Sequence, residues 1–144
     1  MDRRPEEDNM RVSDLMSSQV IATRSEDSIA TLHNLMLEHD IRHIPVVNPE
    51  NELVGLVSHR DLLRQSLVEQ SDVPEFIEDE VRERITVGEV MTTGVLSVEP
   101  DADIREAAQA MYENKFGSLP VVEGDHLVGI LTESDFVRLM AEGN

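Results

Sequence analysis

A nine-residue sequence occurs twice in this chain of 144 residues, and this internal repeat constrains the fold more than any other feature. Residues 55–63 read GLVSHRDLL and residues 129–137 read GILTESDFV. The similarity extends along the chain, because Met16 aligns with Met91 at an offset of 75, which becomes 74 after a one-residue deletion. Two copies indicate a tandem duplication rather than a solenoid, which generally needs about three repeats or more.

Each copy is predicted to fold in the order strand, helix, strand, strand, helix, which is a mixed α/β architecture. Apolar residues recur at intervals of three and four from Ile29 and from Ile104, as on the buried face of a helix. Ser25 and Asp101 are the expected N-caps of these helices. The predicted strands are residues 20–21, 43–47 and 53–57 in the first copy and 95–96, 118–122 and 127–131 in the second.

The repeats divide the chain into four segments. Pro74 suits the first turn of a helix, so residues 75–84 are predicted to form an acidic linker helix. A disordered linker is the alternative, because a run of like charges permits either state. The segments are a charged tail at 1–9, a first repeat at 10–68, the acidic linker, predicted helical, at 69–85 and a second repeat at 86–141.

The composition excludes several classes of protein. A formal net charge of -18 disfavours binding to nucleic acid or to anionic lipid. The longest apolar runs are far shorter than the roughly 20 residues needed to span a membrane. The charged N-terminus lacks the apolar core of a signal peptide, so the expected location is cytoplasmic. The chain has no cysteine, which excludes disulfides and thiolate chemistry.

The repeated sequence has two interpretations, which the residues alone leave open. Ser58 and Asp61, like Thr132 and Asp135, have the spacing of a capping box, in which both side chains bond the free N–H groups of a helix start. A helix start of this kind also offers N–H donors to an anion. A carboxylate one turn into the helix can accept two hydrogen bonds from a ribose diol, which indicates a nucleoside or nucleotide site.

The ordered motifs resemble a tandem pair of CBS (cystathionine-beta-synthase) domains over about residues 10 to 140. The first copy carries MSSQVIATRSEDSI, RHIPVV and GLVSHRD, and the second carries MTTGVLSVEPDADI, GSLPVV and GILTESD. The resemblance implies a stand-alone regulatory module whose two repeats pack around a pseudo-twofold axis. It implies clefts that bind adenosine-containing ligands such as AMP, ADP, ATP or S-adenosylmethionine, signalling by conformational change, a homodimer and an unidentified regulated protein.

The resemblance also implies which residues line two shared clefts. Each cleft combines the first strand and the loop before Pro-Val-Val of one copy with the hydroxyl-to-aspartate motif of the other. The first cleft would contain Val20, Ile21, Arg42, His43, Ile44 and Pro45 with Thr132 and Asp135. The second would contain Val95, Leu96, Gly117, Ser118, Leu119 and Pro120 with Ser58 and Asp61.

The two copies differ in charge at matching positions. Arg42-His43 and His59-Arg60 of the first copy are replaced by Gly117-Ser118 and Glu133-Ser134 in the second. A phosphate needs compensating cations in a protein this acidic, so the first set is expected to hold any bound phosphates. A cleft lined mainly by Glu133 and Ser134 is expected to be poor for ATP, and to be empty or to take a less anionic ligand such as S-adenosylmethionine. Ordinary surface ion pairs are the alternative for both arginines.

No motif indicates catalysis or a metal site. His39 and His43 are four residues apart, but the helix is expected to end between them, and no zinc-binding spacing occurs. No phosphate-binding glycine loop and no nucleophile elbow is present. Glu133 beside Asp135 is the single candidate for a magnesium-dependent enzyme. A ligand sensor without an obligatory cofactor is therefore the first hypothesis, and a structural protein with closed clefts is the second.

Overall fold

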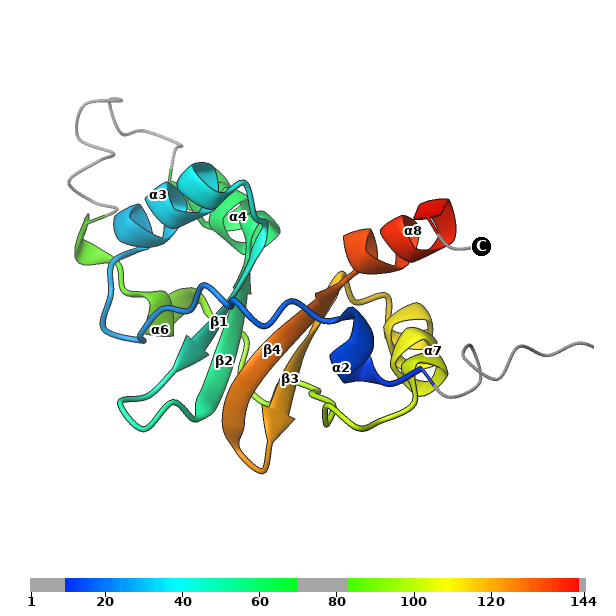
Figure 1. The fold of residues 1–144 in the computed structure, drawn as a ribbon. Coiled ribbons are helices and arrows are strands. Elements are labelled where there is room, and N and C mark those ends of the chain that lie inside the picture. The colour runs from blue at the N-terminus through cyan, green and yellow to red at the C-terminus, as the bar shows by residue number, and fades with distance from the viewer. Residues whose placement is uncertain (1–9, 70–82, 143–144) are drawn as a thin grey trace, which may run out of the picture. The chain divides into compact units, whose positions relative to one another are not determined.

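The computed structural model describes residues 10–69 and 83–142, which divide between two compact units. One unit is Ile21–Val95, and the other combines the described parts of Met1–Val20 and Leu96–Asn144. The described part of each unit contains an antiparallel β-hairpin with helices beside it (Figure 1). The predicted mixed α/β class is confirmed. No helix in these described ranges is long and apolar enough to cross a membrane.

In the unit Ile21–Val95, a hairpin packs against helices. Its elements are α3 (Ile29–His39), β1 (His43–Val47), β2 (Leu53–Ser58), α4 (His59–Glu69) and α6 (Val87–Val90). Strand β1 is buried along almost its whole length, as its unbroken apolar sequence predicts. The core of this unit consists of Ile29, Leu32, Met36, Ile44, Val46, Val57, Leu62 and Val87.

The elements of the other unit also surround a core of their own, but its short helix comes first in the chain, whereas α6 comes last in the unit Ile21–Val95. The elements of this other unit are α2 (Val12–Leu15), α7 (Ile104–Asn114), β3 (Ser118–Glu123), β4 (His126–Thr132) and α8 (Glu133–Glu142). Helices α3 and α7 both end in a left-handed C-cap residue, Asp40 and Lys115. This core consists of Val12, Leu15, Ile104, Ala107, Met111, Leu119, Val121 and Leu131.

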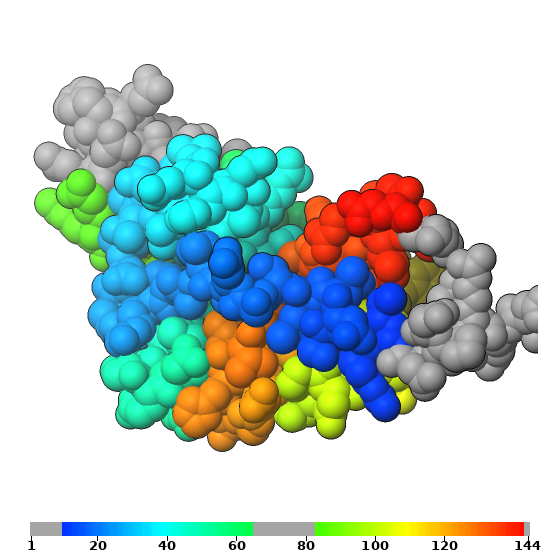
Figure 2. Space-filling model, in the orientation of Figure 1, coloured from blue at the N-terminus to red at the C-terminus, as the bar shows by residue number. Residues whose placement is uncertain are grey.

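The short helix at the start of each repeat packs into the unit built mainly from the other repeat. The N–H of Val12 in α2 donates to the carbonyl of Ala102 at 2.9 Å, and Figure 2 shows the segment that follows Met10 lying against β4. In the other unit, the N–H of Val87 in α6 donates to the carbonyl of Asp27 at 2.7 Å. The boundaries of the compact units therefore differ from those of the sequence repeats. The repeat boundaries 10–68 and 86–141 stay a prediction.

The predicted strands at 20–21 and 95–96 are wrong. The contact lies further along, where Thr23 and Val98 each form a single parallel bridge, to Val46 and Val121. Thr23 donates to the carbonyl of Pro45 at 3.0 Å and accepts from the N–H of Val47 at 2.9 Å. Extending this ladder toward residue 21 would require an N–H at Pro45, which proline lacks.

The same argument holds in the second repeat. Val98 donates to the carbonyl of Pro120 at 3.1 Å and accepts from Val122 at 2.9 Å. A ladder reaching residue 96 would require an N–H at Pro120. Proline therefore prevents each of these single bridges from extending toward the N-terminus.

The predicted N-caps are also wrong, by two or three residues. Helix α3 is capped by Ser28, whose hydroxyl accepts from the N–H of Thr31, and α7 by Asp103. Ser25 instead offers its backbone carbonyl to the N–H of Gly88 at 2.9 Å. The predicted linker helix at 75–84 lies outside the described residues except for its last two, which are helical.

Candidate functional site

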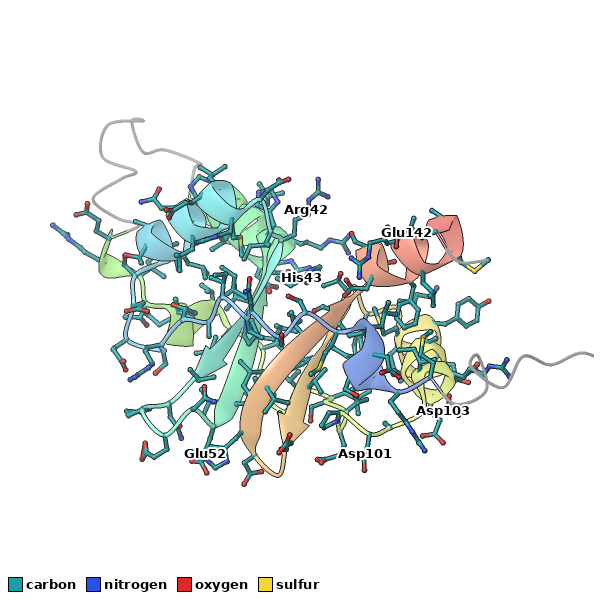
Figure 3. All side chains as sticks on the ribbon, in the orientation of Figure 1. Arg42, His43, Glu52, Asp101, Asp103 and Glu142 are labelled. Atoms are coloured by element: carbon teal, nitrogen blue, oxygen red, sulfur yellow. The ribbon has the colours of Figure 1, made fainter. Side chains whose placement is uncertain are left out.

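In the unit Ile21–Val95, the four basic residues predicted from the first repeat gather at one end of the β1–β2 hairpin. His43 pairs with Ser58 across the sheet, and the N–H of His59 donates to the carbonyl of Arg42 at 2.8 Å. Arg60 follows in the first turn of α4. Figure 3 shows Arg42 and His43 at the end of the hairpin opposite Glu52. Because β2 runs into α4 without a loop, the loop before β1 lies directly beside the helix start.

The matching end of the β3–β4 hairpin has the same geometry without the basic residues. Ser118 pairs with Thr132, and the N–H of Glu133 donates to the carbonyl of Gly117 at 3.1 Å. The Ser118 side chain is buried, and its hydroxyl oxygen has no hydrogen-bond partner among the described residues. The charge difference predicted from the sequence therefore falls on two equivalent helix starts.

Both helix starts carry the capping bonds that the spacing predicts, and at α4 the box is reciprocal, because the N–H of Asp61 also donates to the Ser58 hydroxyl at 3.2 Å. The backbone N–H of Ser58 donates to Oδ2 of Asp61 at 2.7 Å, and the Ser58 hydroxyl donates to the same oxygen at 3.0 Å. Thr132 makes the same two bonds to Oδ2 of Asp135, at 2.8 and 3.2 Å. In both boxes only Oδ2 is used, so capping leaves Oδ1 for other partners.

The two aspartates differ at Oδ1. Nη1 of Arg64 lies 4.0 Å from Oδ1 of Asp61, whereas Nη1 of Arg138 donates to Oδ1 of Asp135 at 3.2 Å. The Asp61 side chain is 19% exposed and that of Asp135 is 9% exposed. The two arginines align in the repeats but were not predicted as site residues. Their position three residues after each aspartate was the available signal, since such residues are neighbours on a helix.

The remaining predicted site residues are divided between the units and differ in accessibility. Val20 and Leu96 belong to one unit, Ile21 and Val95 to the other. Their side chains are half-buried, apart from that of Leu96, which is exposed. Four others lie fully buried, so only their backbone is suited to contact a ligand; these are Ile44, Pro45, Leu119 and Pro120. The structure brings together the loop and the capping box of the same repeat, and the predicted pairing across repeats stays a prediction.

Metal-binding side chains do not cluster in the described ranges. His39 ends α3 and His43 begins β1, with Asp40 in a left-handed conformation between the two elements. No group of three histidine, aspartate or glutamate side chains within residues 10–69 and 83–142 is arranged to hold a metal ion. The geometry is that of two capped helix starts with polar loops beside them.

Comparison with known proteins identifies the family. The sequence matches the CBS domain at residues 12–67 and again at residues 87–142. The chain belongs to the CBS domain family. It contains two CBS domains in tandem, and the nine-residue repeat is the end of each domain.

Solved CBS structures match over nearly the whole chain. A putative acetoin utilization protein (AcuB) from Vibrio cholerae is 36% identical, with a TM-score of 0.79 and coverage of 92% of both chains. The CBS domain pair of protein MJ0100, in complex with 5'-methylthioadenosine and S-adenosyl-L-methionine, is 26% identical, with a TM-score of 0.78 and coverage of 94% of this chain and 98% of that one. CBSX2 in complex with AMP is 28% identical, with a TM-score of 0.75 and coverage of 92% and 96%.

Several curated relatives are much longer proteins. The chain is 30–32% identical to five of them and spans only 23–43% of their length. The similarity to these relatives therefore covers less than half of each of them.

Proposed function

We propose that this CBS pair is a non-catalytic regulatory module that binds adenosine-containing ligands and signals by a change of conformation. The observation that carries the proposal is the free acceptor capacity of Asp61, because its Oδ1 atom accepts no hydrogen bond from a described residue. A partly exposed carboxylate of this kind suits a ribose diol. The adenosyl ligands of the MJ0100 and CBSX2 structures support the ligand class.

The proposed ligand contacts follow the family pattern. The aspartates would hold ribose hydroxyls, the loops before the Pro-Val-Val sequences would present their backbone to the adenine, and half-buried aliphatic residues would pack on its faces. The residues assigned are Val20, Ile21, Arg42, His43, Ile44, Pro45, Ser58, His59, Arg60, Asp61, Val95, Leu96, Gly117, Ser118, Leu119, Pro120, Thr132, Glu133 and Asp135.

The four basic residues at the start of α4 are proposed to hold phosphates. Arg42 and Arg60 place two positive charges at one helix start of a chain whose net charge is -18, and His43 and His59 lie beside them. Helix N–H groups and arginine side chains together favour anions at such a place. The equivalent start of α8 carries Glu133, so it is proposed to take a less anionic adenosyl ligand such as S-adenosylmethionine.

A homodimer is proposed as the functional assembly. Helices α7 and α8 border a groove of about 830 Å³, and Tyr112 and Val137 of its lining are 81% and 66% exposed. Leu37 and Leu63 occupy the matching positions of the first repeat and are also exposed. A second copy carries the same two apolar faces and the same mixture of Lys115 with Glu113 and Glu133, which makes a twofold contact self-complementary.

Isothermal titration at fixed salt with AMP, ATP and S-adenosylmethionine tests the ligand class. Asp61→Asn and Asp135→Asn keep a side-chain oxygen for the capping box and remove the negative charge. Each is expected to weaken binding at its own site by about 10-fold or more, since hydrogen bonds to charged groups are the stronger ones. Glu89→Gln is the matched control, because Glu89 closes a capping box with Thr86 on α6.

Two outcomes would contradict the proposal. Absence of heat from all three ligands, with folded protein in the cell, would favour the structural hypothesis in which the boxes only cap helices. Equal weakening by Glu89→Gln and Asp61→Asn would show that capping, and not ligand contact, controls the measured affinity.

A further inference from the structure

The two capping-box aspartates, Asp61 and Asp135, differ in how many of their hydrogen-bond acceptor sites are occupied. A carboxylate has about four lone-pair sites for hydrogen-bond donors. At Asp61 two sites are used, by the N–H and the hydroxyl of Ser58, both on Oδ2. Nη1 of Arg64 is 4.0 Å from Oδ1, beyond hydrogen-bonding distance, and its side chain is 71% exposed. Two sites on Oδ1 of Asp61 therefore stay open within the described part of the chain.

Asp135 has one open site fewer. Thr132 uses two sites on Oδ2, and Nη1 of Arg138 uses a third on Oδ1 at 3.2 Å. The Arg138 side chain is 51% exposed, and its guanidinium stays protonated at all working pH values, so it remains a hydrogen-bond donor. The lower exposure of Asp135, 9% against 19% for Asp61, also limits replacement of the arginine by water.

We propose that Arg138 is a specificity-determining residue that limits Asp135 to one ligand hydroxyl, whereas Asp61 accepts both hydroxyls of a cis-diol. The inference rests on the proposed function, in which both aspartates face ribose. It predicts that the Asp61 site requires an intact ribose. The Asp135 site takes nucleosides with a single free ribose hydroxyl, including deoxyribose, nearly as well as ribose itself.

The physical reason is the cost of an unmade hydrogen bond. At Asp61, a deoxyribose would leave an acceptor site without a donor after water has been displaced, which weakens binding. At Asp135, the second hydroxyl of an intact ribose meets an acceptor already taken by Arg138, so its removal costs little. Removing the Arg138 guanidinium frees the second site and restores discrimination between ribose and deoxyribose.

Titration of one-site proteins with adenosine, 2'-deoxyadenosine and 3'-deoxyadenosine tests the inference, because these probes carry no phosphate. Asp135→Asn leaves the Asp61 site, which is expected to prefer adenosine by about 10-fold or more. Asp61→Asn leaves the Asp135 site, where the preference is expected to stay below about 3-fold. Adding Arg138→Gln to Asp61→Asn is expected to raise it to about 10-fold. Adding Arg64→Gln to Asp135→Asn is the matched control and is expected to change nothing.

The outcomes separate this inference from the proposed function. Equal discrimination by the two one-site proteins, or no response to Arg138→Gln, would overturn the role of Arg138 while leaving the adenosyl module intact. Loss of adenosine binding in folded Asp61→Asn would also overturn the role of Arg138, because the Asp135 site would then bind no nucleoside. Failure of the folded wild-type chain to bind AMP, S-adenosylmethionine or adenosine would instead overturn the proposed function. A second variant, Arg138→Met, keeps an unbranched apolar stem without the guanidinium and guards against a folding defect in Arg138→Gln.

Discussion

Gly55 shows how a single missing side chain shapes a unit. A Cβ atom there would lie 2.6 Å from Sδ of Met91 and 3.0 Å from the carbonyl oxygen of Thr92. Thr92 and Leu56 exchange backbone hydrogen bonds at 2.9 and 3.0 Å, so the backbone cannot retreat without breaking them. The glycine of the repeated sequence therefore admits a neighbouring backbone rather than a ligand ring.

Gly55→Ala is expected to lower the free energy of unfolding by about 1–3 kcal/mol, because overpacking forces the backbone or the methionine to move. Chemical denaturation measures the change. The matched control is Gly124→Asn, at a turn with φ of 63° where an added Cβ would meet no atom within 4 Å and where asparagine tolerates the left-handed conformation. A destabilisation at position 124 as large as that at position 55 would argue against the close contact as the cause.

Arg42 and Arg60 are expected to matter for phosphates and not for adenosine. Arg42→Gln with Arg60→Gln should weaken ATP binding by about 10-fold or more, since charge-assisted bonds to phosphate are strong, and should reduce its salt dependence. Titration at two salt concentrations measures both effects. Arg24→Gln is the control, because Arg24 lies in the same unit and pairs only loosely with Glu26, at 3.9 Å. An equal loss of adenosine affinity would point to a structural role instead.

At the scale of the element, the capping box of α6 gives a pH dependence. The N–H and hydroxyl of Thr86 donate to Glu89, and these bonds lower the pKa of that exposed carboxylate below its ordinary value of 4.5. A lowered folded-state pKa contributes stability above pH 4.5, which is lost as the pH falls through the folded value. Glu89→Gln should therefore lower the melting temperature at pH 7, with the difference shrinking in acid.

Thermal melts between neutral and acid pH measure this difference. Glu123→Gln, at the exposed end of β3, controls for the change in net charge. A difference between wild type and Glu89→Gln that is constant across the pH range would contradict the role of the ionised carboxylate.

Helices and hairpins were predictable from the sequence, whereas the limits of the first strands were not. The apolar periodicity from Ile29 and from Ile104 gave two helices of eleven residues that begin at those positions. Their N-caps lie at Ser28 and Asp103, because the N–H of Ile29 bonds to the carbonyl of Ile85 and that of Ile104 to Met10. These partners are distant in the sequence, so local patterns carry no signal for them.

The residue types of the candidate site were predictable from the sequence, whereas the side-chain contacts of its two aspartates were not. The hydroxyl and aspartate of each capping box follow from their spacing. The contact of Arg138 with Asp135, and the larger distance between Arg64 and Asp61, depend on side-chain conformations that the repeat alone does not distinguish. Equivalent sequences therefore produce unequal carboxylates.

At the scale of the whole molecule, the apolar face of α7 and α8 carries the prediction about assembly. Tyr112→Glu with Val137→Glu should convert a dimer to a monomer, because burying these carboxylates in an apolar contact would cost desolvation energy. Light scattering after size-exclusion chromatography measures the mass. Ser13→Glu adds an exposed charge to α2 in the same unit and serves as the control. A wild-type chain that is already monomeric at high concentration would contradict the proposed homodimer.

The exchange of α2 and α6 between the repeats has a consequence for synthesis on the ribosome. Val12 emerges first, yet its core partner Ile104 follows roughly 90 residues later. At translation rates of about 5–20 residues per second, that interval is on the order of 5–18 s. The unit Ile21–Val95 begins later in the chain than the other unit, but its residues are all synthesised first. Helix α2 can therefore pack into its core only after the residues of α7, β3 and β4 have been made.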